Sequence, residues 1–575
     1  MLIMQDRFYV ANQLRAIGQL LALTGDNPFK AQAYERGAHA LENLAEDLDT
    51  LVRAHRLTAI SGIGSALAAV IEEVYQTGES FLLQQLREQL PPGAVELSRL
   101  PGLSLKKIAA LHDQLAIESV DALKTACQEG LVRNVKGFGK KSEAKLLADF
   151  EQLAQPSDRF LLHHALSAAE HLLAHLRAAP ELTDAAVAGA LRRREETVRQ
   201  LTIVAGTDQP KMIMDRFLCF PALRTTIELT ERECLAQLAD GMKVRLIIAE
   251  PECYIATLHR ATGSRAHLHG LAQLAARTEN AVREDTAAGD SPENAASGEP
   301  GETAIYHRLG LPYIAPELRE NDGELEAAAA GQLPDLLRLE DIQGMTHCHT
   351  DYSDGANSIE EMALAAAAVG MKYLTITDHS PTAFYARGVQ IDRLSAQWEE
   401  IARVQERVPI KLLRGTESDI TESGALDYPD NILERFDVII ASIHARNKMD
   451  SAQMTDRLLK VLQLPLFKIW GHPLGRLIQS RAPIECRVEE ILDAVAASRA
   501  AIEINGDPHR LDLEPRWIRR ARERGIKFIV STDAHSTRGM GNLHFAVAMA
   551  RRGWLQASDV LNTLDAAGFS EAVRP

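Results

Sequence analysis

The sequence predicts a multidomain protein whose N-terminal part is all helical and whose C-terminal part is a parallel sheet alternating with helices. Its 575 residues are too many for a single hydrophobic core, so three to five domains are expected. Residues 1–155 read as helix and contain three glycine turns. Residues 373–535 contain six apolar segments that read as buried strands, with helix-like stretches between most of them. Repeated strand-then-helix units of this kind indicate a parallel sheet, arranged either as a barrel or as a doubly wound sheet.

The composition is that of an ordinary globular protein, with 46% apolar and 25% charged residues. No run of eighteen apolar residues occurs, so no membrane span is expected, and the polar start does not resemble a secretion signal. Six cysteines without a CxxC pair suit reduced thiols and a cytoplasmic location. The net charge of −16 argues against indiscriminate nucleic-acid binding, so any such contact must be local.

The three glycine turns of the N-terminal part lie at residues 60–64, 100–107 and 135–141, and each leads into a helix. This is the form of a helix-hairpin-helix, in which glycines let the backbone approach a phosphate and the helix N-terminus favours the anion. Such contacts hold a protein on DNA without reading its sequence. The third turn, which carries three lysines, is the best phosphate site, and the helix after the first has no lysine. The residues predicted to contact DNA are Gly62, Gly64, Gly102, Lys106, Lys107, Gly137, Gly139, Lys140 and Lys141.

The C-terminal part carries a pattern of metal-ligand residues. His347 and His349 are one residue apart, so in an extended strand both imidazoles point to the same face, and Asp354 follows in a turn. The six strand-like segments downstream end on further candidates, namely Asp378, His379, Glu417, His444, His472, Asn505, Asp533 and His535. In a barrel, functional residues collect at the carboxyl ends of the strands. We therefore predict a metal site within residues 339–575, of a ligand type that suits manganese, zinc or iron.

On these motifs the C-terminal part resembles the PHP (polymerase and histidinol phosphatase) domain, whose motifs supply nine ligands for up to three metals. The matching residues are His347, His349, Asp354, His379, Glu417, His444, His472, Asp533 and His535. The resemblance implies a distorted (β/α) barrel of PHP type and two to three divalent ions (Mn, Zn or Fe). It also implies one metal on His347, His349, Glu417 and Asp533, a second on Glu417, His444 and His472, and a third on Asp354, His379 and His535.

Three arginines near this pattern could bind phosphate oxygens, because a guanidinium matches the geometry of a phosphate. They are Arg387, Arg476 and Arg510, and each could equally form a structural ion pair. His509 is a candidate general acid. We take Glu417, Arg476 and Arg510 as the candidate catalytic residues.

Residues 27–41, 186–205, 260–267 and 309–328 extend the resemblance over nearly the whole chain, to bacterial family-X DNA polymerases with a C-terminal PHP domain. The resemblance implies an α+β nucleotidyltransferase-like palm between the two outer parts. The expected domains are an N-terminal helical domain (1–85), a fingers-like helical domain (86–155), a degenerate palm and thumb (156–277), an acidic linker and connector (278–338) and the PHP domain (339–575).

The chain departs from this family at the polymerase active site. Where the family has three metal-binding carboxylates, this sequence has Gln200, Thr202 and Arg245. Two-metal phosphoryl transfer needs anionic oxygens, and an arginine repels a metal. Residues 278–303 are polar and acidic and are expected to form a disordered loop in place of a folded thumb segment. DNA-directed synthesis is therefore predicted to be lost.

Three functions remain open at this stage. The leading one, which the resemblance implies, is metal-dependent hydrolysis of DNA phosphodiesters as a 3′→5′ exonuclease, with abasic-site or 3′-end processing as related activities. The expected partner is gapped or 3′-ended DNA, which the protein would bind without sequence specificity. No binding to a membrane is expected. The alternatives are a small-molecule phosphomonoesterase of the histidinol-phosphatase kind and a non-catalytic scaffold that binds gapped DNA.

Overall fold

The protein is described from a computed structural model. It covers residues 7–24, 28–42, 48–60, 62–88, 90, 94–97, 103, 105–153, 159–285, 301–445 and 449–574. The chain divides into two compact units, residues 1–158 and 159–575. Each unit has its own hydrophobic core, so each is described by itself.

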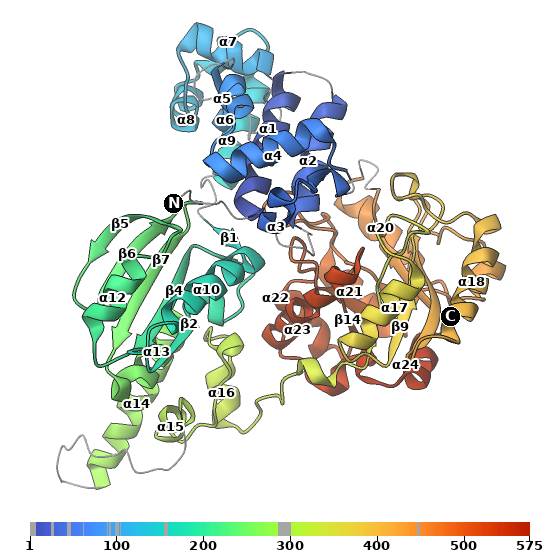
Figure 1. Ribbon diagram of the computed structural model, residues 1–575. Coiled ribbons are helices and arrows are strands. Elements are labelled where there is room, and N and C mark those ends of the chain that lie inside the picture. Colours follow the sequence, from blue (N-terminus) through green and yellow to red (C-terminus); the bar gives the residue numbers. More distant parts are fainter. Residues whose placement is uncertain are drawn as a thin grey trace. The chain divides into compact units, whose positions relative to one another are not determined.

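The described residues of the first unit form helices and turns, with no strand among them (Figure 1, blue to cyan). Its helices are α1 (Arg7–Thr24), α2 (Pro28–Glu42), α3 (Leu48–Arg53), α4 (Ser65–Thr77), α5 (Phe81–Glu88), α6 (Ala94–Leu97), α7 (Leu105–Leu115), α8 (Val120–Gln128) and α9 (Lys140–Leu153). Apolar side chains from these helices, such as Leu14, Ile71 and Leu111, are fully buried in one core. The all-helical prediction for this part is confirmed.

The second unit begins with a five-stranded sheet that corresponds to the expected palm. The strand order is β2-β4-β7-β6-β5, in which only β4 and β7 are parallel. The strands are β2 (Asp184–Ala188), β4 (Gln200–Gly206), β5 (Leu223–Leu229), β6 (Glu233–Leu238) and β7 (Lys243–Ala249), with a small separate sheet of β1 (Phe160–Leu161) and β3 (Thr197–Val198). The helices of this region are α10 (Leu162–Arg177), α11 (Gly189–Arg192), α12 (Pro210–Leu218) and α13 (Tyr254–Thr262).

Helices continue into the region that the sequence assigned to a linker. Helix α14 (Arg265–Asp285) runs through the boundary expected at residue 277, so residues 278–285 are helical rather than disordered. Beyond it lie α15 (Thr303–His307) and α16 (Glu324–Ala329). The remainder of the predicted loop, residues 286–300, lies outside the described residues.

A seven-stranded parallel barrel forms the C-terminal part of the second unit (Figure 1, yellow to red). Its strands follow chain order, namely β8 (Gly344–Met345), β9 (Tyr373–Ile376), β10 (Lys411–Asp419), β11 (Val438–Ser442), β12 (Ile469–Trp470), β13 (Ala501–Asn505) and β14 (Phe528–Ser531). A bridge between Cys348 and Ala534 joins the segments that follow the first and last strands, so the sheet nearly closes on itself. The structure thus decides for a barrel over a doubly wound sheet.

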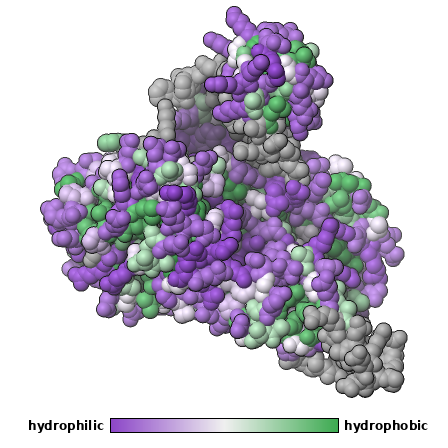
Figure 2. Space-filling view, turned by 180° about the vertical axis from the view of Figure 1, so that it is seen from behind, coloured by the Kyte–Doolittle hydropathy of each residue, from purple (hydrophilic) through white to green (hydrophobic). Residues whose placement is uncertain are grey.

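Helices lie between these strands, as predicted, and two more follow the last strand. They are α17 (Ile359–Ala368), α18 (Ile391–Gln405), α19 (Asp430–Leu433), α20 (Ser451–Val461), α21 (Val488–Ala497), α22 (Pro515–Glu523), α23 (Leu543–Arg552) and α24 (Ala566–Val573). The strands are buried on both faces, as expected of a parallel sheet that helices cover. Among the described residues, no helix is long and apolar enough to cross a membrane. The face drawn in Figure 2 is mostly hydrophilic, with small scattered apolar patches.

Candidate metal centre and DNA-binding turns

Parallel strands bring the predicted ligands to one end of the barrel. His347 and His349 follow β8, and their rings lie 5.1 Å apart, both fully buried. Glu417 lies near the end of β10. His379, His444, His472, Asp533 and His535 each follow the carboxyl end of a further strand. Residues that are almost 200 positions apart in the sequence therefore meet at one site because their strands share a direction.

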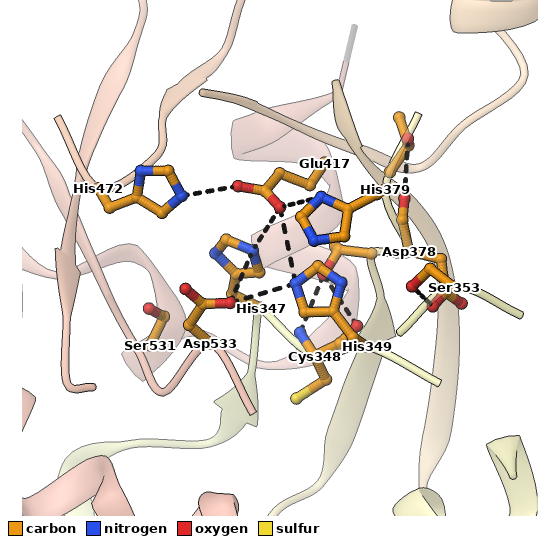
Figure 3. Close-up of polar contacts among 12 residues, drawn as sticks. His347, Cys348, His349, Ser353, Asp378, His379, Glu417, His472, Ser531 and Asp533 are labelled. Atoms are coloured by element: carbon orange, nitrogen blue, oxygen red, sulfur yellow. Dashed lines mark hydrogen bonds and ion pairs between the residues drawn. The ribbon is translucent and has the colours of Figure 1, made fainter. Parts of the chain in front are cut away.

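The carboxylate of Glu417 lies at the centre of this site (Figure 3). Its Oε2 is 2.8 Å from Nδ1 of His379 and 3.5 Å from Nε2 of His347. Its Oε1 is 2.9 Å from Nε2 of His472 and 3.3 Å from Nε2 of His444. Oε2 also lies 3.6 Å from Nε2 of His349, so three imidazoles face Oε2 and two face Oε1. This is the arrangement expected of a carboxylate that bridges two metals.

Three groups of side chains among the described residues have ligand atoms close enough to share a metal ion. They are His347, His349 and Asp533; His379, Glu417 and His444; and His349, Asp354, His379 and His535. All nine residues matched to the family therefore take part, with His472 joined through Glu417. The groups overlap more than the sequence implied, because His379 lies 3.6 Å from Asp354 as well as beside Glu417.

The donor atoms fit divalent cations. Nε2 of His347 and both carboxylate oxygens of Glu417 are buried and accept or donate no hydrogen bond within the described structure. Leaving such groups without a partner is costly, and a bound cation would satisfy them. The mixture of imidazole and carboxylate suits manganese, zinc or iron. The site therefore indicates binding of divalent metal.

The carboxylates of the site are ionised. Burial by itself raises the pKa of a carboxyl group, yet the surrounding histidines hold the pKa of Glu417 and of Asp533 well below the ordinary value. Contact with His535 lowers the pKa of Asp354 to about 2, against the effect of burial. Three negative charges are thus present at neutral pH in a largely buried site, which favours cations.

Three histidines of the site have a raised pKa and are protonated at neutral pH. Burial would lower each pKa, but neighbouring carboxylates raise that of His347 well above its ordinary value, that of His444 to about 10 and that of His535 to about 9. His349 differs, because burial and the adjacent His535 lower its pKa to about 3. Since only neutral imidazoles bind metals, loading the site must displace the protons of the first three.

Two acidic residues that the sequence analysis did not single out hold the ligands in place. Nδ1 of His347 lies 2.5 Å from Oε1 of Glu503, whose other oxygen accepts a hydrogen bond from the backbone N–H of His472. Nδ1 of His444 lies 2.8 Å from Asp419. Such partners fix the orientation of an imidazole, so that its other nitrogen faces the metal. An acid inside the apolar segment 501–505 was the signal that could have revealed Glu503.

Two residues at strand ends do not face the centre as ligands. Asp378 is almost fully buried and accepts hydrogen bonds from Thr350, Ser353 and Gln397, so it braces the loop after β8. Asn505 donates a hydrogen bond of 3.2 Å to Asp533 and thus supports a ligand.

The two candidate catalytic arginines differ sharply. Arg510 is largely buried beside Asp533, 3.7 Å away, and its Nε and one terminal nitrogen have no hydrogen-bond partner within the described residues. Arg476 is surrounded by five protein oxygens, those of Glu196 (two), Glu514, and the carbonyl groups of Arg510 and Leu511. A guanidinium has five N–H groups, so Arg476 has none left for a phosphate. Its predicted phosphate-binding role does not agree with these contacts.

The other two candidates are Arg387 and His509. Arg387 is exposed and adopts a left-handed backbone with φ of 56°. The ring of His509 lies edge-on to that of His163, with centroids 4.9 Å apart.

Two of the glycine turns in the first unit share one conformation. Gly62 and Gly137 have φ of +87° and +94°, and each is followed by a glycine that precedes a helix, Gly64 before α4 and Gly139 before α9. A side chain at Gly62, Gly64 or Gly139 would meet no atom within 4 Å, so the backbone there is open to a ligand. Lys140 and Lys141 are exposed at the start of α9. In the second turn, Lys106 is exposed on α7 and Lys107 is half-buried, whereas Gly102 lies outside the described residues.

The three palm positions at which carboxylates were expected to be missing, Gln200, Thr202 and Arg245, lie on neighbouring strands. Gln200 and Thr202 share one face of β4, with 3.3 Å between the Gln200 amide nitrogen and the Thr202 hydroxyl. Arg245 is the direct neighbour of Thr202 on β7, and its guanidinium is paired with Glu233. Among the described residues, all groups of three or more potential metal ligands lie in the barrel and none in the palm.

Known protein families match four parts of the chain. The PHP domain matches residues 346–507, a helix-hairpin-helix domain matches 8–80, a SAM-like helix-hairpin-helix tandem matches 94–152, and the DNA polymerase beta thumb matches 257–320. The last match corrects the expectation that a polar loop replaces the thumb, because a thumb segment is present and includes α14 and α15. The helix-hairpin-helix and thumb matches indicate DNA binding.

Related proteins match either the whole chain or its last part. DNA polymerase/3′-5′ exonuclease PolX of Bacillus subtilis (strain 168) is 34% identical over 96% of this chain and 96% of its own length. A probable phosphatase of Thermoanaerobacter sp. (strain X514) is 31% identical over 38% of this chain and 89% of its own length. A probable phosphatase of Vibrio parahaemolyticus is 27% identical over 39% of this chain and 90% of its own length.

Proposed function

Because this chain belongs to the family-X DNA polymerases that carry a C-terminal PHP domain, we propose that it degrades DNA from the 3′ end at the barrel's metal centre. The observation that carries this proposal is that nine predicted ligand residues gather at one site, in which Glu417 contacts five histidines. The largely buried Arg510 lies beside this site, and its Nε and Nη1 have no hydrogen-bond partner among the described residues. The attached helix-hairpin-helix domains favour DNA as the substrate, since a small phosphoester needs no such domains. Abasic-site cleavage and 3′-end processing are related reactions that the same centre could perform.

The residues of the site would divide the work of phosphodiester hydrolysis. His347, His349, Asp533 and Glu417 would hold one divalent ion, Glu417, His444 and His472 a second, and Asp354, His379 and His535 a third. Bound ions of this kind lower the pKa of water and stabilise charge on the phosphate. Arg510 would hold a phosphate oxygen in a largely buried site, where such a contact is strong. Glu503 and Asp419 would keep His347 and His444 oriented toward the ions.

We further propose that the palm has lost DNA synthesis. An amide, a hydroxyl and a guanidinium occupy the positions of the three metal-binding carboxylates, and Arg245 is the partner of Thr202 in the register of β4 and β7. The two arginines of the palm turn are also engaged, Arg192 with Glu302 and Arg193 with Glu320. DNA bound by the helix-hairpin-helix turns through its backbone would then serve hydrolysis alone, with gapped or 3′-ended DNA as the expected partner.

The test uses a 5′-labelled oligonucleotide, single-stranded or 3′-recessed, with manganese and with or without deoxynucleotides. We expect a ladder of shortened products that is absent in His349→Ala and no extended primer. Extension of the primer would overturn the loss of synthesis. DNA that remains undegraded while the protein carries its full metal content would overturn the proposed exonuclease activity.

A phosphomonoesterase is the second candidate, because the relatives that match the barrel alone are named probable phosphatases. It predicts turnover of a small phosphomonoester that DNA does not stimulate. Binding of gapped DNA without turnover under any metal would instead favour a non-catalytic scaffold.

A further inference from the structure

A carboxylate of the palm contacts the loops that surround the metal centre. Glu196, just before β3, forms a two-pronged ion pair with Arg476 of the barrel, with oxygen-to-nitrogen distances of 2.5 and 3.2 Å. The Arg476 side chain is only 7% exposed, and Glu196 is 25% exposed. A bidentate pair between partly buried groups fixes both side chains in one geometry.

Arg476 connects the loop after β12 with the loop after β13. It follows the ligand His472 by four positions. Its Nε donates a hydrogen bond of 2.9 Å to the carbonyl of Arg510, and a terminal nitrogen donates to the carbonyl of Leu511. Leu511 has a left-handed φ of 43°, a strained conformation that persists only when its surroundings hold it.

The turn held in this way presents Arg510 to the metal centre. The side chain of Asp507 accepts a hydrogen bond from the backbone N–H of His509, and its backbone carbonyl accepts one from the N–H of Arg510. Asp507 thereby closes the turn. Nε and Nη1 of the Arg510 side chain have no hydrogen-bond partner among the described residues, and Nε lies 3.6 Å from Asp507 of the turn and 3.7 Å from the ligand Asp533. The direction of the Arg510 side chain therefore depends on the turn, and Arg476 helps to hold the backbone of this turn through the carbonyl groups of Arg510 and Leu511.

We propose that Glu196 is a positioning residue for the phosphoesterase reaction, which holds Arg476 so that Arg510 stays aimed at the substrate phosphate. The inference rests on the proposed hydrolysis. It gives the palm a role in the reaction although its own metal carboxylates are missing. The palm and barrel have other connections, such as Arg193 and Arg552, whose contacts do not include the loops after β12 and β13. Glu196 is thus not needed merely to keep the two parts together.

The first measurement compares Glu196→Gln with Glu195→Gln in the full manganese-loaded chain. Glu195 is the matched control, since it pairs with Arg159 and Arg193 and not with Arg476. For Glu196→Gln we expect kcat to fall at least about tenfold on a single-stranded oligonucleotide and on bis(p-nitrophenyl) phosphate, because small displacements of catalytic groups have large effects. Bound manganese per chain and the melting temperature should match those of the control, whose kcat should stay within about twofold of wild type.

A double-mutant cycle with Arg510→Ala shows whether Glu196 acts through Arg510. In that background Glu196→Gln should change kcat by less than about twofold, because the residue that it positions is gone. Additive effects, or a Glu196→Gln variant that behaves like the control, would overturn the proposal. Glu196→Asp, which keeps the charge, should recover part of the loss.

Hydrogen exchange separates this proposal from the proposed function. Without any substrate, amides of residues 507–512 should exchange faster in Glu196→Gln than in wild type or in Glu195→Gln. If wild type cleaves neither substrate, the proposed hydrolysis fails, and unchanged exchange would then refute the positioning role independently.

Discussion

Glu302 provides the sharpest test of how the second unit is held together. Its carboxylate accepts four hydrogen bonds, two from Arg192 and two from Arg319, at 2.7 to 3.1 Å. The Glu302 side chain is 6% exposed and that of Arg319 is fully buried. Replacing Glu302 by Gln therefore leaves two guanidinium groups without a counter-charge in a buried site.

The size of the effect follows from the pKa of Glu302. Burial would raise it, but the two arginines lower it from 4.5 to about 2. At 1.36 kcal/mol per pKa unit, this difference corresponds to about 3 kcal/mol in favour of the folded state at pH 7. Removing one partner of a buried ion pair costs about 3–5 kcal/mol, so Glu302→Gln should lower the free energy of unfolding by about that amount.

The pH dependence has a definite sign. Because the folded-state pKa lies below the unfolded value of 4.5, the stabilisation is complete above pH 4.5 and is lost as the pH falls toward about 2. The difference between wild type and Glu302→Gln should accordingly narrow by about 1 kcal/mol between pH 7 and pH 4.

Urea unfolding followed by tryptophan fluorescence measures this difference, because all four tryptophans lie between residues 398 and 554. The control is Glu250→Gln, which breaks the exposed pair with Arg232 and should cost less than about 1 kcal/mol. A Glu302→Gln variant as stable as this control, or a difference that does not change with pH, would refute the reasoning.

Three further predictions concern the metal centre and the DNA-binding turns. Glu503→Gln should weaken manganese binding about 10- to 100-fold in a competition with a chelator, because His347 loses the partner that orients it; an unchanged affinity would exclude that role. Saturating manganese, at about 100 times its dissociation constant, should stabilise the second unit by about 2.7 kcal/mol, and a melting temperature that EDTA leaves unchanged would argue against a site in the folded protein. Replacing Lys140 and Lys141 by Ala should weaken DNA binding and reduce the salt dependence by about two phosphate contacts, whereas Lys145→Ala, farther along α9, should have little effect.

Much of the fold could be predicted because its signals are local. The apolar segments that form β9 to β14 and the helical stretches between them are readable from short windows of sequence, and so are glycines such as Gly62 and Gly137. The expectation of a disordered loop from residue 278 was wrong because the acidic composition of residues 278–303 concealed the last helical residues of α14.

The sequence by itself determined which residue types gather at the metal centre. Each candidate stands at the end of a strand, and parallel strands must deliver their ends to one side of the barrel. Only the tertiary structure decided which ligands face the same oxygen of Glu417. It also showed that His379 belongs to two of the ligand groups, because it lies close to both Asp354 and Glu417. It further showed that the donors of Arg476 are engaged by protein oxygens whereas two nitrogens of Arg510 are not, although the sequence presents both as candidates for binding phosphate. The partner that occupies Arg476 is Glu196, 280 residues away in the chain, and no local pattern can show that its donors are already used.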